Sequence, residues 1–196
     1  MRLFSALEIS DEVREEISVW WSSACLYLPA DQWRDVRKIN WHLTLAFYGD
    51  ICGDDLDDLG EALADVAADT SPLLLRTDGC GVFPRADRPR VFWVGAGMHG
   101  EETGAGRPLR YLARCCRQAG HVTLRKHTAK SEPFRGHITL ARAAPDASPL
   151  EVFFWQALPE IPVLTWRVDS LNLYASQLKS QGPIYRLVEA FEFKGK

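Results

Sequence analysis

The stretch Trp41-His42-Leu43-Thr44-Leu45-Ala46 recurs near the other end of the chain as Gly136-His137-Ile138-Thr139-Leu140-Ala141. Both copies are rich in apolar and β-branched residues, which predicts that each forms a strand. Side chains alternate between the two faces of a strand, so the His and the Thr of each copy share one face. Two such strands facing each other would place an acid, a base and two hydroxyl groups around one small anion.

Strict alternation also assigns the other side chains of these strands. His42 and Thr44 would share the polar face, and the small Ala46 would leave room beside them. The opposite face, which turns toward the core, would carry three apolar side chains: Leu43, Leu45 and Phe47. In the second copy, the same rule points Arg142 away from His137 unless the strand ends or twists between them.

A third copy, Gly120-His121-Val122-Thr123-Leu124-Arg125, competes for a place in the pair. Gly120 is predicted to end the preceding helix, and the residues after Leu124 form a polar run typical of a loop. The copy with His137 instead lies inside a strand-like run. The context therefore favours His42 and His137 as the pair.

The composition limits the class of protein. A chain of 196 residues fits one domain, or two lobes that share one core. No apolar run is long enough to span a bilayer, and the N-terminus lacks the pattern of a signal peptide. The five cysteines have no metal-ligand spacing, which predicts reduced thiols in a cytoplasmic protein.

The net charge of −3 hides an uneven distribution of charge. Residues 1–70 hold fifteen acidic against five basic side chains, whereas residues 71–145 hold thirteen basic against five acidic ones. A basic segment inside an acidic protein indicates a local anion site rather than a general coat for nucleic acid. The acidic side chains of residues 1–70 are expected to lie on solvated surfaces.

Periodicity and turn residues predict an α+β chain. Strands are expected over 2–9, 41–48, 72–80, 90–97, 136–142, 163–174 and 185–193. Helices are expected from the Ser10 or Asp11 cap to Pro29, over 54–68, over 108–119 and over 148–157, with loops at 81–89, 100–106 and 125–135. The order of elements is roughly the same pattern twice, which suggests a bilobed fold with a cleft between two pseudo-symmetric lobes.

Several motifs together resemble the two-histidine phosphoesterase superfamily, and within it the RNA 2',3'-cyclic phosphodiesterases, also called 2'-5' RNA ligases. The likeness covers nearly the whole chain. The motifs that carry it are Arg2-Leu3-Phe4, His42-Leu43-Thr44-Leu45, Gly81-Val82-Phe83-Pro84, Phe134 to Arg142, and Leu173-Tyr174-Ala175-Ser176. The paired His-x-Thr motifs are the specific part.

The resemblance implies roles for five residues. His42 and His137 would be the catalytic pair, Thr44 and Thr139 would bind phosphate oxygens, and Arg142 would help to hold the phosphate. Neutral His137 would activate water, and protonated His42 would donate a proton to the departing 3' oxygen, leaving a 2'-phosphate. The resemblance also implies that the active site needs no metal or other cofactor.

The chain departs from the family pattern at a few positions. Gly136 stands where relatives usually have Pro, which should loosen the start of the second strand. Ser5 replaces a position that is often aromatic or branched, so one base contact would be lost. The extra copy at His121 and Thr123 is unusual as well.

We expect a monomer that acts on RNA ends or nucleoside 2',3'-cyclic phosphates and has no membrane partner. Predicted RNA contacts are Phe4, Phe83, Arg125, Lys126, Lys130, Phe134 and Arg135. Trp41 is a further candidate for base stacking, and Arg85, Arg88 and Arg90 are candidates for the RNA backbone. Three rival readings stay open: joining of tRNA halves through a 2'-5' linkage, a non-catalytic nucleotide- or RNA-binding module, and a structural domain with coincidental motifs.

Overall fold

The computed structural model describes residues 1–51, 53, 55–100, 107–124, 133–179 and 182–195. Its strands are β1 (Arg2–Leu7), β2 (Trp33–Asp35), β3 (Leu43–Asp50), β4 (Leu73–Arg85), β5 (Arg88–Met98), β6 (His137–Ala143), β7 (Thr165–Val168), β8 (Ser170–Lys179) and β9 (Gly182–Glu192). Its helices are α1 (Asp11–Ala24), α2 (Asp55–Ala68), α3 (Arg107–Leu124) and α4 (Val152–Ala157), with 3-10 turns η1 (Cys25–Tyr27) and η2 (Lys38–Asn40).

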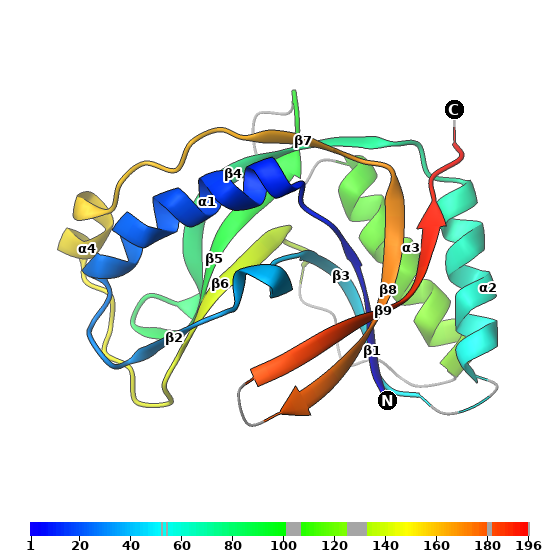
Figure 1. The fold of residues 1–196 in the computed structure, drawn as a ribbon, viewed down its shortest axis with the longest axis horizontal. Coiled ribbons are helices and arrows are strands. Elements are labelled where there is room, and N and C mark those ends of the chain that lie inside the picture. The colour runs from blue at the N-terminus through cyan, green and yellow to red at the C-terminus, as the bar shows by residue number, and fades with distance from the viewer. Residues whose placement is uncertain (52, 54, 101–106, 125–132, 180–181, 196) are drawn as a thin grey trace.

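Within the described residues, the strands form one curled antiparallel sheet in the order β7-β4-β5-β6-β3-β1-β8-β9, and β2 pairs with β6. The two halves of this sheet meet where Leu43 of β3 pairs with Ile138 of β6. α1 and α4 lie over one half, and α2 and α3 lie over the other (Figure 1). The fold is therefore the bilobed α+β arrangement that the sequence predicts.

Each half has its own apolar core against its helices. Trp20 and Trp21 of α1 and Phe154 of α4 surround the ring of Phe92 on β5, with centroids 5.0–6.5 Å apart. On the other half, α3 packs against β3, where the hydroxyl oxygen of Tyr48 lies 3.3 Å from the carbonyl oxygen of Cys116. The helices thus cover the outer side of the sheet and leave the line where β3 meets β6 for the site.

Several predicted boundaries differ from the structure. The helix expected to end at Ala119 continues to Leu124 as α3. Gly120 does not end the helix but allows it to pack closely on β3, since a Cβ at position 120 would lie 2.4 Å from the Tyr48 ring. His121 and Thr123 are therefore helical, and the Thr123 hydroxyl donates to the carbonyl of Ala119 (2.9 Å).

The predicted loop 81–89 is also wrong, because most of it belongs to the hairpin of β4 and β5, in which Phe83 pairs with Val91. The predicted strand 163–174 is instead two strands, β7 on β4 and β8 on β1, at different places in the sheet. The polar segment 30–40 contains the short strand β2, which was not predicted because its residues do not alternate between apolar and polar. The expected loop 100–106 lies mostly outside the described residues.

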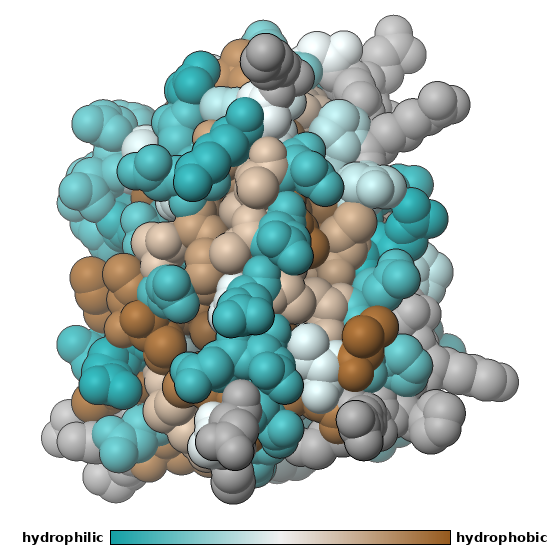
Figure 2. All heavy atoms as spheres, turned by 90° about the vertical axis from the view of Figure 1, so that its right-hand side faces the viewer, coloured by the Kyte–Doolittle hydropathy of each residue, from teal (hydrophilic) through white to brown (hydrophobic). Residues whose placement is uncertain are grey.

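The acidic N-terminal part behaves as a solvated surface. The acidic side chains in the first turn of α2, Asp55, Asp57 and Asp58, are exposed, as the charge pattern predicts. Figure 2 shows the face that carries α2, where hydrophilic side chains are widespread and hydrophobic ones stand in separate groups. Among the described residues, no helix combines the length and the apolar character that a membrane span requires.

Candidate active site

The two histidines meet because of the register between β3 and β6. Leu43 pairs with Ile138, and each of these residues directly follows a histidine. Since the strands are antiparallel, this register places His42 on the side of Thr139 and Thr44 on the side of His137. All four side chains line one cavity of about 410 Å³, which we call the central cavity.

Both imidazoles are held in the same way. Nδ1 of His42 lies 2.7 Å from the carbonyl oxygen of Asn40, and Nδ1 of His137 lies 2.8 Å from that of Arg135. A carbonyl can only accept, so Nδ1 carries the hydrogen in each ring. Nε2 is left for chemistry in both histidines, and in His42 it lies 3.0 Å from the hydroxyl of Thr44.

Aromatic rings support each histidine. The ring of the buried Phe4 lies 4.9 Å from that of His42 and 5.4 Å from that of Tyr174. Phe83 meets His137 edge-on at 4.9 Å. These contacts restrict the rotation of the imidazoles and remove them partly from water.

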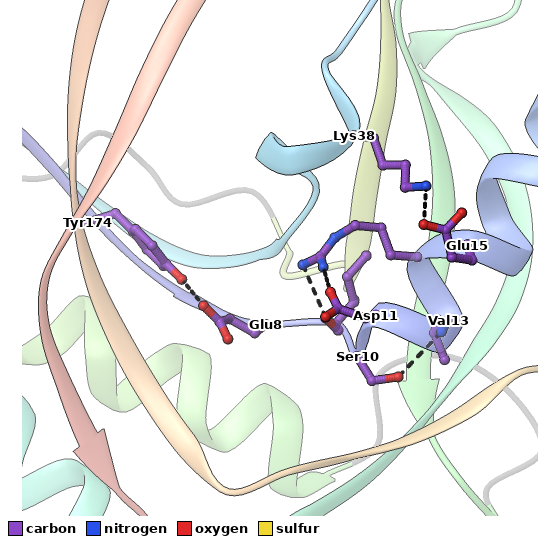
Figure 3. A network of polar contacts seen from close by, with 9 residues as sticks. Glu8, Ser10, Asp11, Val13, Glu15, Lys38 and Tyr174 are labelled. Carbon is purple, nitrogen blue, oxygen red and sulfur yellow. Dashed lines mark hydrogen bonds and ion pairs between the residues drawn. The ribbon is translucent and has the colours of Figure 1, made fainter.

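Polar contacts join the segments that surround the site. Lys38 of η2 forms an ion pair with Glu15 of α1, and the hydroxyl of Tyr174 donates to the carboxylate of Glu8 at 2.6 Å (Figure 3). The buried side-chain amide of Asn40 donates to the carbonyl of Pro183 (2.9 Å), while the backbone carbonyl of Asn40 accepts from His42. The sequence pattern gave no sign that Asn40 has this double role.

Burial changes the acidity of both rings. It is the main cause that lowers the pKa of His42 from 6.5 to about 4, and the positive charges of His137 and Arg142 act in the same direction. Burial likewise lowers the pKa of His137, assisted by Arg135 and Arg142. The hydrogen bonds to the backbone carbonyls oppose this effect, because they favour the charged form.

A β-bulge brings Arg142 to the cavity. Trp93 of β5 pairs with Thr139 and the preceding Phe92 pairs with Ala141, so Leu140 is an extra residue in β6. An extra residue reverses the alternation beyond it. Arg142 therefore lies on the same side as His137 and lines the central cavity, against the strict alternation expected from the sequence.

The first copy has a bulge at the same position, and it corrects the prediction for Phe47. Ser5 of β1 pairs with Ala46 and Ala6 pairs with Thr44, so Leu45 is the extra residue in β3. Phe47 does not enter the core: its side chain is 72% exposed and lines the central cavity. The signal for this site residue was present in the sequence, since Phe47 follows Thr44 at the spacing at which Arg142 follows Thr139.

Two further cavities adjoin the central one. The first, which we call the aromatic cavity, measures about 690 Å³ and is lined by Phe47, Phe83, Phe134, Arg117 and Arg135, among others. The second, the arginine cavity, measures about 160 Å³ and is lined by Arg34, Arg37, Arg142, Asn40 and Tyr185, among others. Each of these two cavities has some lining residues in common with the central cavity, and the two sets differ. The aromatic and arginine cavities have no lining residue in common.

The structure separates the predicted RNA contacts into groups. Phe83, Phe134 and Arg135 line the aromatic cavity, whereas Phe4 lies behind His42. Trp41 is buried with its indole N–H on the carbonyl of Val36, so it cannot stack on a base. Arg125, Lys126 and Lys130 lie outside the described residues.

The other basic and polar candidates are engaged elsewhere. Arg85 pairs with Asp87, and Arg90 donates to the carbonyl of Ala144 (2.7 Å). Arg88 is exposed at the tip of the same hairpin and lines none of the three cavities. Ser5 is fully buried and accepts a hydrogen bond from the hydroxyl of Tyr48 (2.8 Å), so its position is a core position rather than a base contact.

Comparison with known proteins assigns the chain to a family. The model of the family described as LigT like Phosphoesterase matches residues 7–93. A Thermus thermophilus protein named RNA 2',3'-cyclic phosphodiesterase is 30% identical over the whole chain and 92% of its own length. The chain belongs to the LigT-like phosphoesterases.

Two other relatives extend the comparison. A Geobacillus stearothermophilus protein with the same name is 30% identical over 98% of this chain, which spans only 57% of that relative. The crystal structure of E. coli LigT complexed with 3'-AMP has a TM-score of 0.77 and 27% identity, and the match covers 98% of this chain and 97% of that one. The similarity therefore covers both lobes and the cleft between them.

Proposed function

We propose that this phosphoesterase hydrolyses 2',3'-cyclic phosphate ends of RNA to 2'-phosphates, with His42 and His137 as the acid–base pair. The observation that carries this proposal is the matched arrangement of the two imidazoles. Each has Nδ1 on a backbone carbonyl, and both line one cavity beside Thr44, Thr139 and Arg142, with Nε2 of His42 on the hydroxyl of Thr44.

The reaction needs a proton taker and a proton giver on opposite sides of one phosphorus atom. Nε2 of neutral His137 takes a proton from water as the water oxygen bonds to phosphorus. The bond from phosphorus to the 3' oxygen breaks, and Nε2–H of charged His42 donates its proton to that oxygen. The products are a 3'-hydroxyl and a 2'-phosphate monoester.

Fixed donors in the cavity support the same chemistry. The guanidinium of Arg142 and the hydroxyls of Thr44 and Thr139 can stabilise charge that develops on the phosphoryl oxygens. The assignment of the base to His137 and the acid to His42 follows the family resemblance. The names of the relatives and the nucleotide bound to E. coli LigT support a substrate with a phosphate on the ribose.

The pH dependence of the reaction follows from the lowered pKa values. Both rings are mainly neutral at pH 7 in the free protein, because their pKa values lie below 6.5. The reaction requires one charged imidazole, and this form is lost as the pH rises above those pKa values. We therefore expect kcat/KM to be highest in the acidic range and to fall through neutrality.

The profile of kcat should differ from that of kcat/KM. A bound anionic phosphate favours the charged imidazole, so the optimum of kcat should lie at higher pH. Steady-state rates measured across the pH range give both profiles. An optimum of kcat/KM above neutrality would contradict the protonation states assigned to the free protein.

The exposed ring of Phe47 is proposed as the platform for the terminal base, because it lies where the central and aromatic cavities join. Stacking of a base on an aromatic ring contributes about 1–3 kcal/mol. F47A should therefore lower kcat/KM for a nucleoside 2',3'-cyclic phosphate by about tenfold or more, mainly through KM. Hydrolysis of bis(4-nitrophenyl) phosphate, which has no nucleobase, should change little.

The matched control for this variant is F153A, since Phe153 is 70% exposed on α4 and outside the three cavities. Its kinetic constants should equal those of the unchanged protein. Equal losses on both substrates in F47A would assign Phe47 to the shape of the site rather than to the base.

A further inference from the structure

The arginine cavity holds two positive charges, those of Arg34 and Arg37, that the proposed reaction does not use. Arg34 and Arg37 are exposed, and they lie with Arg142 around a hollow next to the central cavity. Within the part of the chain that the structure describes, none of these three guanidinium groups has a carboxylate partner. Lys38, which follows Arg37 in the chain, differs because it pairs with Glu15.

The backbone brings two of these charges together. Arg34 of β2 and Arg142 of β6 are direct partners in the antiparallel pairing of the two strands. Like charges at directly opposite positions destabilise a strand pair. A bound anion would offset this repulsion, and Arg groups are well suited to bind phosphate oxygens.

One carboxylate also lines the cavity, and it is engaged. Asp35 accepts a hydrogen bond from the indole N–H of the buried Trp21 (3.2 Å). Three guanidinium groups outnumber this single negative charge. The cavity therefore favours an anion.

The position of the cavity indicates which anion it would bind. The arginine cavity adjoins the central cavity through Val36, Asn40, Arg142 and Tyr185. The aromatic cavity adjoins the central cavity through a different set of residues. In a nucleotide, the base and the 5' carbon leave the ribose from opposite ends of the sugar. With a base in the aromatic cavity, the arginine cavity is the other adjoining hollow and would receive the 5' side of the nucleotide.

We propose that Arg34 and Arg37 form a second phosphate subsite, which binds the phosphate on the 5' side of the terminal nucleotide. This inference rests on the proposed function, because it takes the cyclic phosphate to lie in the central cavity. It predicts a preference for RNA ends, and for nucleotides with a 5'-phosphate, over nucleosides whose only phosphate is the cyclic one. Arg142 lies between the two subsites and faces both.

Calorimetric binding of two product-like nucleotides tests this subsite. Adenosine 2'-monophosphate and adenosine 2',5'-bisphosphate differ only in the 5'-phosphate. The unchanged protein should bind the bisphosphate about tenfold or more tightly than the monophosphate. The double variant R34Q/R37Q should lose this preference and bind the monophosphate with unchanged affinity.

The matched control is R88Q/R110Q, which removes two exposed arginines that line none of the three cavities. It should keep the preference for the bisphosphate. Equal binding of both nucleotides by the unchanged protein, or a preference that survives in R34Q/R37Q, would overturn the subsite while leaving the proposed function in place. Failure of the unchanged protein to bind either nucleotide would count against both.

Discussion

H42A and H137A are each expected to lower kcat/KM for adenosine 2',3'-cyclic phosphate by about 10²–10⁴-fold, the usual contribution of one general acid or base. Neither ring is part of the apolar core, so thermal unfolding should show that both variants fold. H121A is the matched control, because His121 is exposed on α3 and outside the three cavities. A loss of activity in H121A similar to the other two would mean that the wrong copies had been paired.

A second substrate separates the roles of the two histidines. A phosphodiester with a 4-nitrophenolate leaving group does not need a proton on that group. H42A should therefore recover much of its activity on this substrate, whereas H137A should not, since it lacks the base that activates water. The opposite pattern would exchange the acid and the base. Absence of turnover in the unchanged protein would favour the non-catalytic binding module.

G136A is expected to reduce both stability and activity. A Cβ at position 136 would lie 2.3 Å from the carbonyl oxygen of Ala96, a backbone atom that cannot move without disturbing β5. Overpacking of this kind costs about 1–3 kcal/mol of folding free energy. Because His137 is the next residue, a displacement of about 1 Å there could also lower kcat/KM by about 10²-fold.

Gly60 provides the control for this substitution. A Cβ at Gly60, inside α2, would make only an ordinary contact with the carboxylate of Glu189 at 3.4 Å. Ala is the better helix former by about 1 kcal/mol, so G60A should be neutral or stabilising. Chemical denaturation of both variants makes the comparison, and an unchanged midpoint for G136A would show that β5 yields to the added methyl group.

The surroundings of Gly136 give a reason for this glycine that the sequence did not offer. A glycine at the start of the second strand should loosen it by its conformational freedom. In the structure Gly136 is buried, and its carbonyl accepts a hydrogen bond from the N–H of Ala96 (3.0 Å). The residue is therefore a point of close contact between strands, which only the position of β5 could reveal.

Local sequence patterns were sufficient to predict the elements that expose one side to water and pack the other side against the core. The predicted cap is present, since Ser10 accepts from the N–H of Val13 (3.3 Å), and Val13, Ile17 and Trp20 are buried at helical spacing along α1. The His-x-Thr copies and their context predicted that His42 and His137 pair, and both line one cavity in the structure. These features depend on residues that are close together in the chain, so a single sequence is enough to predict them.

The remaining features depend on pairing between distant segments. The bulges at Leu45 and Leu140, which turn Phe47 and Arg142 toward the site, arise from the registers with β1 and β5. The close packing of α3 on Tyr48 explains why Gly120 does not end that helix.

The amino-acid sequence alone thus predicts the α+β class from local patterns, the family from the resemblance of several motifs, and the pair of histidines from the His-x-Thr copies and their context. Tertiary pairing of the strands decided on which side of β3 Phe47 lies and on which side of β6 Arg142 lies. It also decided that Arg34 lies beside Arg142. The physical reason is that one extra residue in a strand reverses every later side chain, and no local preference records where the partner strand omits one.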